Sequence, residues 1–388
     1  MRGFKVNCAA GTREAGLGHA LLSASSSHRW LNCPPSARLC EKYEDTGSEY
    51  AQEGTDAHSL CEYKLKQALG MDAADPTENL SFYNEEMEQC ASDYAAYVLE
   101  LVEGAKKSCK DPVVLIEQRL DFSRFVKDGF GTGDAIIVAD GILRIVDMKY
   151  GTGVAVSAEN NSQMRLYALG ALEMFGDLYD IDTVSMTIYQ PRLSNISTDT
   201  ISKADLLEWA ETVLRPVAEL AYKGEGELNA GSWCRFCKLR STCRKRAEAN
   251  LALAQHDFKL PPTLSDEEIS VILDKLDDLT SWAADIREYA LCAALSGTRF
   301  DGWKLVEGRA NRRYTDEAAV AQAVISSGHD PYERRLLGIT AMERMLGKKQ
   351  FATLLDNLVE RPQGKPTLVP ASDKRPEMTN AKNDFAND

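Results

Sequence analysis

Residues 130–150 read FGTGDAIIVADGILRIVDMKY, two apolar runs that meet at the dipeptide Asp140 and Gly141. Asp-Gly readily takes the positive φ angles of a tight hairpin turn, and the flanking runs are rich in the β-branched residues that strands favour. We therefore predict two antiparallel strands here. The preceding segment VVLIEQRLDF, residues 113–122, predicts a third strand and completes a three-stranded meander.

The segments on either side of this meander have mostly helical spacing. In chain order the predicted elements are helices over residues 51–69 and 84–102, the meander, a helix over 160–175, a strand over 183–189 and a helix over 203–222. This order is typical of an α/β fold with one central mixed sheet flanked by helices.

Composition restricts the class of protein. Of the 388 residues, 44% are hydrophobic, which is enough for a substantial core. The net charge of -14 argues against a protein that coats nucleic acid nonspecifically, so any contact with phosphates is expected to be local. No run approaches the roughly 20 apolar residues of a membrane span, and the N-terminus does not resemble a secretory signal. We expect an intracellular, cytoplasmic protein that makes no membrane contact.

The chain divides by composition into four parts. Ser265 and Glu268 have the spacing of a helix capping box, and apolar positions at helical spacing follow as far as Leu295. There is no internal repeat. The four predicted parts are a flexible N-terminus (residues 1–20), an α/β domain (21–250), a mainly helical region (260–360) and a disordered tail (361–388).

Two acids and a lysine gather in the predicted meander. Asp134 lies early in the second strand and Asp147 near the end of the third, so antiparallel pairing brings both carboxylates to the same end of the sheet. Lys149 follows Asp147 by two residues and therefore lies on the same face. Carboxylates held close together repel, and a divalent cation such as Mg²⁺ or Mn²⁺ relieves that repulsion. The pattern alone also fits a surface hairpin with a solvated Asp–Lys pair.

Asp134 followed by DMK at residues 147–149 resembles the motif of the PD-(D/E)XK nucleases, and the flanking segments resemble the RecB-like branch of that superfamily. In that branch an upstream helix carries a histidine in a Gly-Thr-x-x-His context, which EGTDAH matches here with His58. The branch also has Gln-x-x-x-Tyr on the helix after the lysine strand. Gln163 and Tyr167 match it and share one helical face. The resemblance implies a restriction-endonuclease-like core.

The same resemblance implies a role for each residue. Lys149 would position the attacking water and stabilise negative charge on the phosphate, and Gln163 and Tyr167 would contact DNA. Glu117 on the first strand either joins the metal site or is a strand-face acid, and we favour the strand-face interpretation. The implied metal ligands are His58, Asp134, Asp147 and the backbone carbonyl of Met148.

Clustered cysteines predict a second metal centre. Cys234, Cys237 and Cys243 have the spacing C-x2-C-x5-C, with which thiolates can converge on one centre. The RecB-like relatives that carry an iron–sulfur cluster take their first cysteine from a Cys-Pro segment near the N-terminus, and the resemblance thus implies Cys33 as the fourth ligand of a [4Fe–4S] cluster. Zn²⁺ also accepts four thiolates, and spacing does not choose between the two. We expect the remaining cysteines to be free structural residues: Cys8, Cys40, Cys61, Cys90, Cys109 and Cys292.

Basic residues surround the cysteine cluster on an otherwise acidic chain. No acid occurs between Gly231 and Arg246, so the segment is either a phosphate track or a solvated helix face. A second basic group, Arg309, Arg312 and Arg313, either contacts nucleic acid or consists of ordinary surface charges. The predicted track consists of Arg235, Lys238, Arg240, Arg244, Lys245 and Arg246.

Taken together, the residues and the resemblance predict a metal-dependent DNA nuclease, most simply an exonuclease, that hydrolyses phosphodiester bonds in single-stranded DNA or at DNA ends. SASSSHRWLNCPPSARL (residues 23–39) and GKPTLVP (364–370) resemble a family of uncharacterised proteins encoded mostly by bacteriophages and prophages. That setting implies recombination, replication or DNA-end processing, with phage recombination proteins as partners. The alternatives are a recombination accessory that binds nucleic acid without cutting it and a zinc-stapled interaction protein.

Overall fold

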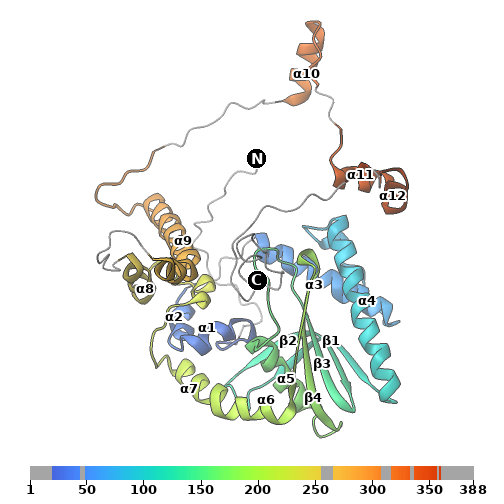
Figure 1. Cartoon of the computed structure of the whole chain (residues 1–388), viewed down its shortest axis with the longest axis vertical. Helices are drawn as coiled ribbons and strands as arrows, with labels where there is room; N and C mark the ends of the chain where they lie inside the picture. The colour runs from blue at the N-terminus through green and yellow to red at the C-terminus, as the bar shows by residue number, and fades with distance from the viewer. Residues whose placement is uncertain are drawn as a thin grey trace, which may run out of the picture. The chain divides into compact units, whose positions relative to one another are not determined.

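The computed structural model in Figure 1 describes residues 20–43, 49–254, 265–306, 316–332, 336–355 and 358–359. It divides into two compact units, residues 1–301 and residues 302–388, which we describe separately. The predicted flexible N-terminus up to residue 19, the predicted disordered tail, Cys8 and the basic group at residues 309–313 lie outside the described residues.

A five-stranded mixed sheet forms the centre of the first unit. Its strands, in the order in which they lie side by side, are β1 (Val113–Asp121), β2 (Phe130–Ala139), β3 (Gly141–Met148), β4 (Ile181–Gln190) and β5 (Asn195–Ser202). β1, β2 and β3 form the predicted antiparallel meander, β4 pairs parallel with β3, and β5 pairs antiparallel with β4. Gly141, at the turn between β2 and β3, has a φ of +82°, as expected for the second residue of an Asp-Gly turn.

Helices pack on both faces of this sheet. The helices of the first unit are α1 (Ser27–Asn32), α2 (Ser36–Glu41), α3 (Glu49–Ala68), α4 (Glu85–Ser108), α5 (Ser162–Phe175), α6 (Lys203–Trp209), α7 (Arg215–Lys223), α8 (Arg244–Ala254) and α9 (Asp266–Leu295). The second unit contains α10 (Glu317–Ser326), α11 (Ile339–Leu346) and α12 (Lys348–Leu355). Within the described residues, no helix combines the length and the apolar character needed to cross a membrane.

The two faces of the sheet support separate hydrophobic cores. On one face Ile137 and Val146 pack with α3 and α4, and on the other Ile136 and Ile145 pack with α5 and α6 (Figure 1). This division follows from the alternation of side chains along each strand. The α/β fold with a mixed central sheet flanked by helices and a helical C-terminal region is thus confirmed.

Three details differ from the predicted elements. The edge strand β5 is absent from the predicted elements, because its residues lack the apolar alternation that marks a half-buried strand. The predicted helix over residues 203–222 is interrupted by a π-helical turn at Ala210–Leu214, just before Pro216 removes a backbone donor. The division between the units falls after residue 301 and not near 250–260, because ion pairs tie α9 to the segment that precedes it.

Candidate metal and active site

Asp134 and Asp147 lie on neighbouring strands and face the same side of the sheet. Ala135 of β2 pairs with Val146 of β3, so the two aspartates are the next residues along the same ladder. By alternation they share the face of the β2 and β3 residues that pack toward α5. Both are buried, with 8% of Asp134 and 2% of Asp147 exposed. The predicted convergence at one end of the sheet is therefore present.

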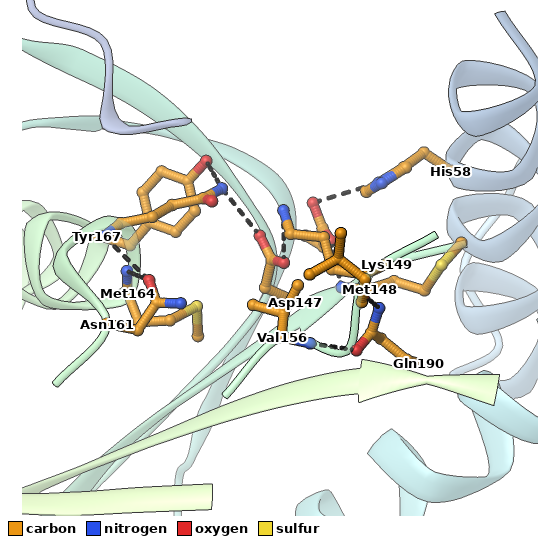
Figure 2. A network of polar contacts seen from close by, with 12 residues as sticks. His58, Asp147, Met148, Lys149, Val156, Asn161, Met164, Tyr167 and Gln190 are labelled. Carbon is orange, nitrogen blue, oxygen red and sulfur yellow. Dashed lines mark hydrogen bonds and ion pairs between the residues drawn. The ribbon is translucent and has the colours of Figure 1, made fainter. Parts of the chain in front are cut away.

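Helix α3 brings His58 to Asp134 (Figure 2). His58 Nδ1 lies 3.4 Å from Asp134 Oδ1, and Asp134 Oδ2 accepts a 2.7 Å hydrogen bond from the backbone N–H of Met148. Burial lowers the pKa of His58, but the charge and hydrogen bond of Asp134 together with the charge of Asp147 outweigh it and raise the pKa from 6.5 to about 9. Burial also opposes ionisation of Asp134, yet His58 holds the pKa of Asp134 below its usual range. The pair is an imidazolium facing a carboxylate.

Glu117 joins this pair from β1. One ligand atom each from His58, Glu117 and Asp134 lies within 4.8 Å of the other two. Burial and the nearby charge of Asp134 raise the pKa of Glu117 to about 7. The sequence favours a strand-face acid for Glu117, whereas the structure brings its carboxylate near His58 and Asp134, and its backbone has a φ of +50° within the strand. That left-handed conformation breaks the regular alternation and cannot be read from the strand pattern.

Asp147 is held by a lysine and an amide. Lys149 Nζ lies 2.8 Å from Asp147 Oδ2, and Gln163 Nε2 donates to Asp147 Oδ1 at 3.2 Å. The same Gln163 nitrogen lies 3.0 Å from the hydroxyl of Tyr167, which completes a polar chain from β3 to α5 (Figure 2). Helix α5 begins at this point because the side chain of Asn161 accepts hydrogen bonds from its first free backbone N–H groups.

Burial sets the electrostatics of Asp147 and Lys149. It raises the pKa of Asp147 despite the nearby Lys149. Burial also lowers the pKa of Lys149, but the charges of Asp147 and Asp134 and the hydrogen bond to Asp147 together outweigh it and raise that pKa. Within the described part of the chain, Asp147 Oδ2 is buried without a hydrogen-bond donor of good geometry, although it contacts the ammonium. A buried carboxylate oxygen in this state can still accept a cation or a donor.

The donor set fits a small divalent cation. Mg²⁺ and similar ions bind oxygen and nitrogen ligands at about 2.0–2.2 Å, so ligand atoms around one ion lie about 3–4 Å apart. The group of His58, Glu117 and Asp134 offers two carboxylates and one imidazole, with ligand atoms within 4.8 Å of one another. Asp147 lies outside the group as it stands, and its role as a ligand, like that of the Met148 carbonyl, stays a prediction.

Tyr167 is packed into the core beside the site and is not displayed on the surface. Only 6% of it is exposed, and burial raises its pKa. Its ring approaches β2 so closely that a Cβ at Gly131 would lie 2.7 Å from Tyr167 Cε1. The hydroxyl therefore serves first as the hydrogen-bond partner of Gln163, and the predicted contact of both residues with DNA stays a prediction.

The four predicted cysteines line one cavity. Cys33, Cys234, Cys237 and Cys243 all contribute to its wall, between the α1–α2 junction and the short 3-10 helix η5 (Ser232–Phe236). Residues 33 and 234 are far apart in sequence, and the fold alone brings them together. All of these cysteines are unpaired thiols.

The spacing of the sulfur atoms is more open than a zinc tetrahedron requires. Zn–S bonds of about 2.3 Å place the sulfurs of a tetrahedral site about 3.8 Å apart. Among the described residues, the group of three or more candidate metal ligands within 4.8 Å of one another consists of His58, Glu117 and Asp134. No three cysteine sulfurs in this part of the chain are therefore that close together.

Cys40 lies beside the predicted ligands, although the sequence predicted a free structural cysteine. Its Sγ is 3.7 Å from that of Cys237. This contact lowers the pKa of Cys40 to about 6 and raises the pKa of Cys237. Only the fold signals this pairing, because Cys40 is 197 residues away in the chain.

A family model described as "Protein of unknown function (DUF2800)" matches residues 19–376, which include every helix and strand described above. The chain belongs to the DUF2800 family. Among solved structures, the DUF2800 chain is similar to one titled "Crystal structure of SSO0001", at 15% identity over 48% of this chain and 94% of that chain. The TM-score of 0.22 is too low to support a structural argument.

Helix α1 links the two candidate centres of the DUF2800 protein. Ser27 and Ser162 share a 2.7 Å hydrogen bond, which joins α1 to the start of α5. One residue later, His28 packs edge-on against Trp233 of η5 at a ring distance of 5.9 Å. The cysteine cavity and the helix that carries Gln163 therefore contact the same short helix.

The structure divides the predicted phosphate track of the DUF2800 protein. Arg246 is fully buried and forms ion pairs with Asp278 and Asp285 of α9, and Arg240 pairs with Asp285 as well. These two arginines are engaged in holding α9, so the prediction that they form part of an open track is wrong. Arg235 and Arg244 remain exposed.

Proposed function

We propose that this protein is a metal-dependent deoxyribonuclease of the PD-(D/E)XK type that hydrolyses phosphodiester bonds. The observation that carries the proposal is the pair of buried acids on adjacent strands, each with its own cationic partner. Asp134 faces His58 at 3.4 Å, and Asp147 faces Lys149 at 2.8 Å. A fold that only needed stability would gain little from two buried ion pairs at one sheet end.

His58, Glu117 and Asp134 would hold Mg²⁺ or Mn²⁺, with Asp147 as the expected further ligand. A bound divalent ion supplies Lewis acidity toward a phosphodiester and toward the attacking water. Because the ligands are most effective when deprotonated, the proton on His58 has to leave when the ion binds. The acids and the imidazole are already within reach of one another.

Lys149 provides a fixed positive charge beside the scissile phosphate. Its ammonium is held by Asp147, so it is already oriented and needs no rearrangement when negative charge develops in the transition state. Gln163 fixes the other carboxylate oxygen, and Tyr167 fixes Gln163. These two residues therefore act first by positioning Asp147.

The cysteine cavity would hold a [4Fe–4S] cluster with a structural role. Its four cysteines connect the N-terminal helices to η5, and four thiolates lining one cavity suit such a cluster. Action as an exonuclease in phage recombination, replication or DNA-end processing is the setting we infer from the resemblance of the sequence.

The proposal is tested by digestion of end-labelled single- and double-stranded DNA with Mg²⁺ or Mn²⁺. We expect cleavage that EDTA abolishes, and a loss of about 100-fold or more in Asp134→Asn, Asp147→Ala and Lys149→Met. Asp182→Asn is the matched control, because Asp182 is an exposed strand acid of the same sheet. Absence of cleavage, or equal cleavage by the site variants, would overturn the proposal. Retained DNA binding in that case would favour the non-cutting accessory.

A further inference from the structure

Arg235 and Phe236 are the exposed residues between two buried cysteines. Both lie on η5, where Cys234 and Cys237 point into the cysteine cavity. Phe236 is 75% exposed, and the Arg235 guanidinium lies 5.9 Å from the centre of its ring. We refer to these two side chains as the Arg235–Phe236 patch.

Arg235 is one of the basic residues of this segment that form no ion pair within the described residues. Arg240 and Arg246 are paired with acids of α9, whereas no carboxylate in the described residues forms an ion pair with Arg235. An arginine without an intramolecular anion keeps its five donors free for a phosphate.

The guanidinium of Arg235 also lies beside the loop that follows Lys149. A Cβ at Gly153 would lie 3.9 Å from Arg235 Nη2, so the guanidinium rests beside the backbone of that glycine. Gly153 follows Lys149 by four residues, in an exposed loop that leads from β3 to α5. The patch therefore borders the loop that begins at the proposed catalytic lysine.

We propose that the Arg235–Phe236 patch binds single-stranded nucleic acid next to the active site, an inference that rests on the proposed nuclease function. Arg235 binds a backbone phosphate, and Phe236 stacks on an adjacent base. Exposed aromatic rings beside free cations are the usual platform for single strands, since each base offers an open face. In a duplex the base faces are already stacked, so the ring can be used only by an unpaired strand.

The test measures binding separately from cleavage. Full-length protein carrying Lys149→Met is titrated against a labelled single-stranded oligonucleotide and against a hairpin duplex, by fluorescence anisotropy at several salt concentrations. Arg235→Gln should weaken single-strand binding about 10-fold and reduce the slope of log affinity against log salt by about 1. Phe236→Ala should weaken it about 5- to 100-fold and leave duplex binding nearly unchanged.

Arg244→Gln is the matched control, because it removes an exposed arginine from the same segment. Phe236→Trp should restore binding, since its ring also stacks. The proposal that the Arg235–Phe236 patch binds single strands is overturned if Arg235→Gln and Phe236→Ala bind them as tightly as the control does. Equal loss in Phe236→Trp and Phe236→Ala also overturns it, because this points to a damaged fold. These outcomes are independent of cleavage, so a protein that binds through the patch but never cuts would refute only the nuclease.

Discussion

At position 117 a glutamate adopts a backbone conformation that residues other than glycine seldom take. Glu117 has a φ of +50° and lies between Ile116 and Gln118, both of which pair regularly with β2. Holding a residue in this region costs about 1–3 kcal/mol and is retained where the side chain must reach a particular place. Here the conformation delivers a carboxylate to His58 and Asp134.

We expect Glu117→Gln to stabilise the metal-free protein and to weaken Mn²⁺ binding. Burial and Asp134 raise the pKa of Glu117 to about 7, so at pH 8 its ionisation opposes folding and a neutral amide removes that cost. The amide is also a poorer ligand for the ion. Thermal unfolding at pH 8, in EDTA and in Mn²⁺, measures both effects. Glu100→Gln, at an exposed acid of α4, is the control and should change neither. A lower melting temperature of Glu117→Gln than of the wild type in EDTA would contradict the expectation.

The ion pair of His58 predicts a pH dependence. Because the folded protein raises the pKa of His58 from 6.5 to about 9, the pair contributes stability that is complete below pH 6.5 and is lost as the pH rises to 9. In EDTA the melting temperature should therefore fall by a few degrees over this window. His58→Asn should flatten the profile. Mn²⁺ should reverse the loss, because metal replaces the proton between the same ligands.

Most of the candidate site could be predicted from the sequence. The spacing within a hairpin places Asp134, Asp147 and Lys149, since strand alternation and antiparallel register follow from the residue pattern. Glu117 could not be placed, because the sign of φ at a single strand residue leaves no mark in the sequence. Cys40 was missed for another reason, namely that its contact with Cys237 arises only in the folded chain.

At the scale of elements, β2 and α5 meet at Gly131. We expect Gly131→Ala to cost about 1–3 kcal/mol in stability and to lower nuclease activity, because its methyl group would lie 2.7 Å from the Tyr167 ring. The displaced hydroxyl would no longer hold Gln163. Gly104→Ala is the control, since the space around Gly104 in α4 is open and alanine favours a helix. Urea unfolding together with the digestion assay tests this, and unchanged values for both would refute it.

Arg246 joins α8 to α9. We expect Arg246→Met to loosen α9 and to lower the free energy of unfolding by an amount near the lower end of about 3–5 kcal/mol. Asp285 would be left nearly buried without its partner, which is costly, whereas Asp278 is partly exposed and would lose less. Hydrogen exchange of α9 should accelerate while that of β2 and β3 stays unchanged. Arg244→Met removes an exposed arginine two residues away and serves as the control. Equal protection of α9 in both variants would show that the ion pairs do not hold it.

The elements themselves were predictable to different degrees. Hairpin chemistry at Asp140 and Gly141 and the apolar alternation predicted the meander, and helix capping predicted the start of α9 at Ser265. The edge strand β5 escaped because its residues are mostly polar and its pairing is supplied by β4. The attachment of α9 to the first unit depends on ion pairs between distant residues, which periodicity does not report.

For the whole molecule, the cysteine cavity predicts a defined metal content. Protein purified without oxygen should contain roughly four irons per chain and show a visible absorbance band. Cys234→Ser should lose both and unfold at a lower temperature, because the N-terminal helices are no longer tied to η5. Cys292→Ser, on α9, should retain the iron. One zinc ion per chain and no visible absorbance band would contradict the iron–sulfur cluster and favour the zinc-stapled alternative.

Helix α1 decides where the chain can be shortened. A fragment that begins at residue 34 would retain the whole sheet and all of the acids discussed above. It would lose Ser27, the fully buried Trp30 and Cys33. The gap opened by the missing indole would reach the core next to α5. Truncations, affinity tags and protease sites should therefore not remove or interrupt α1, even though this helix contributes no strand to the sheet and none of the acids discussed above.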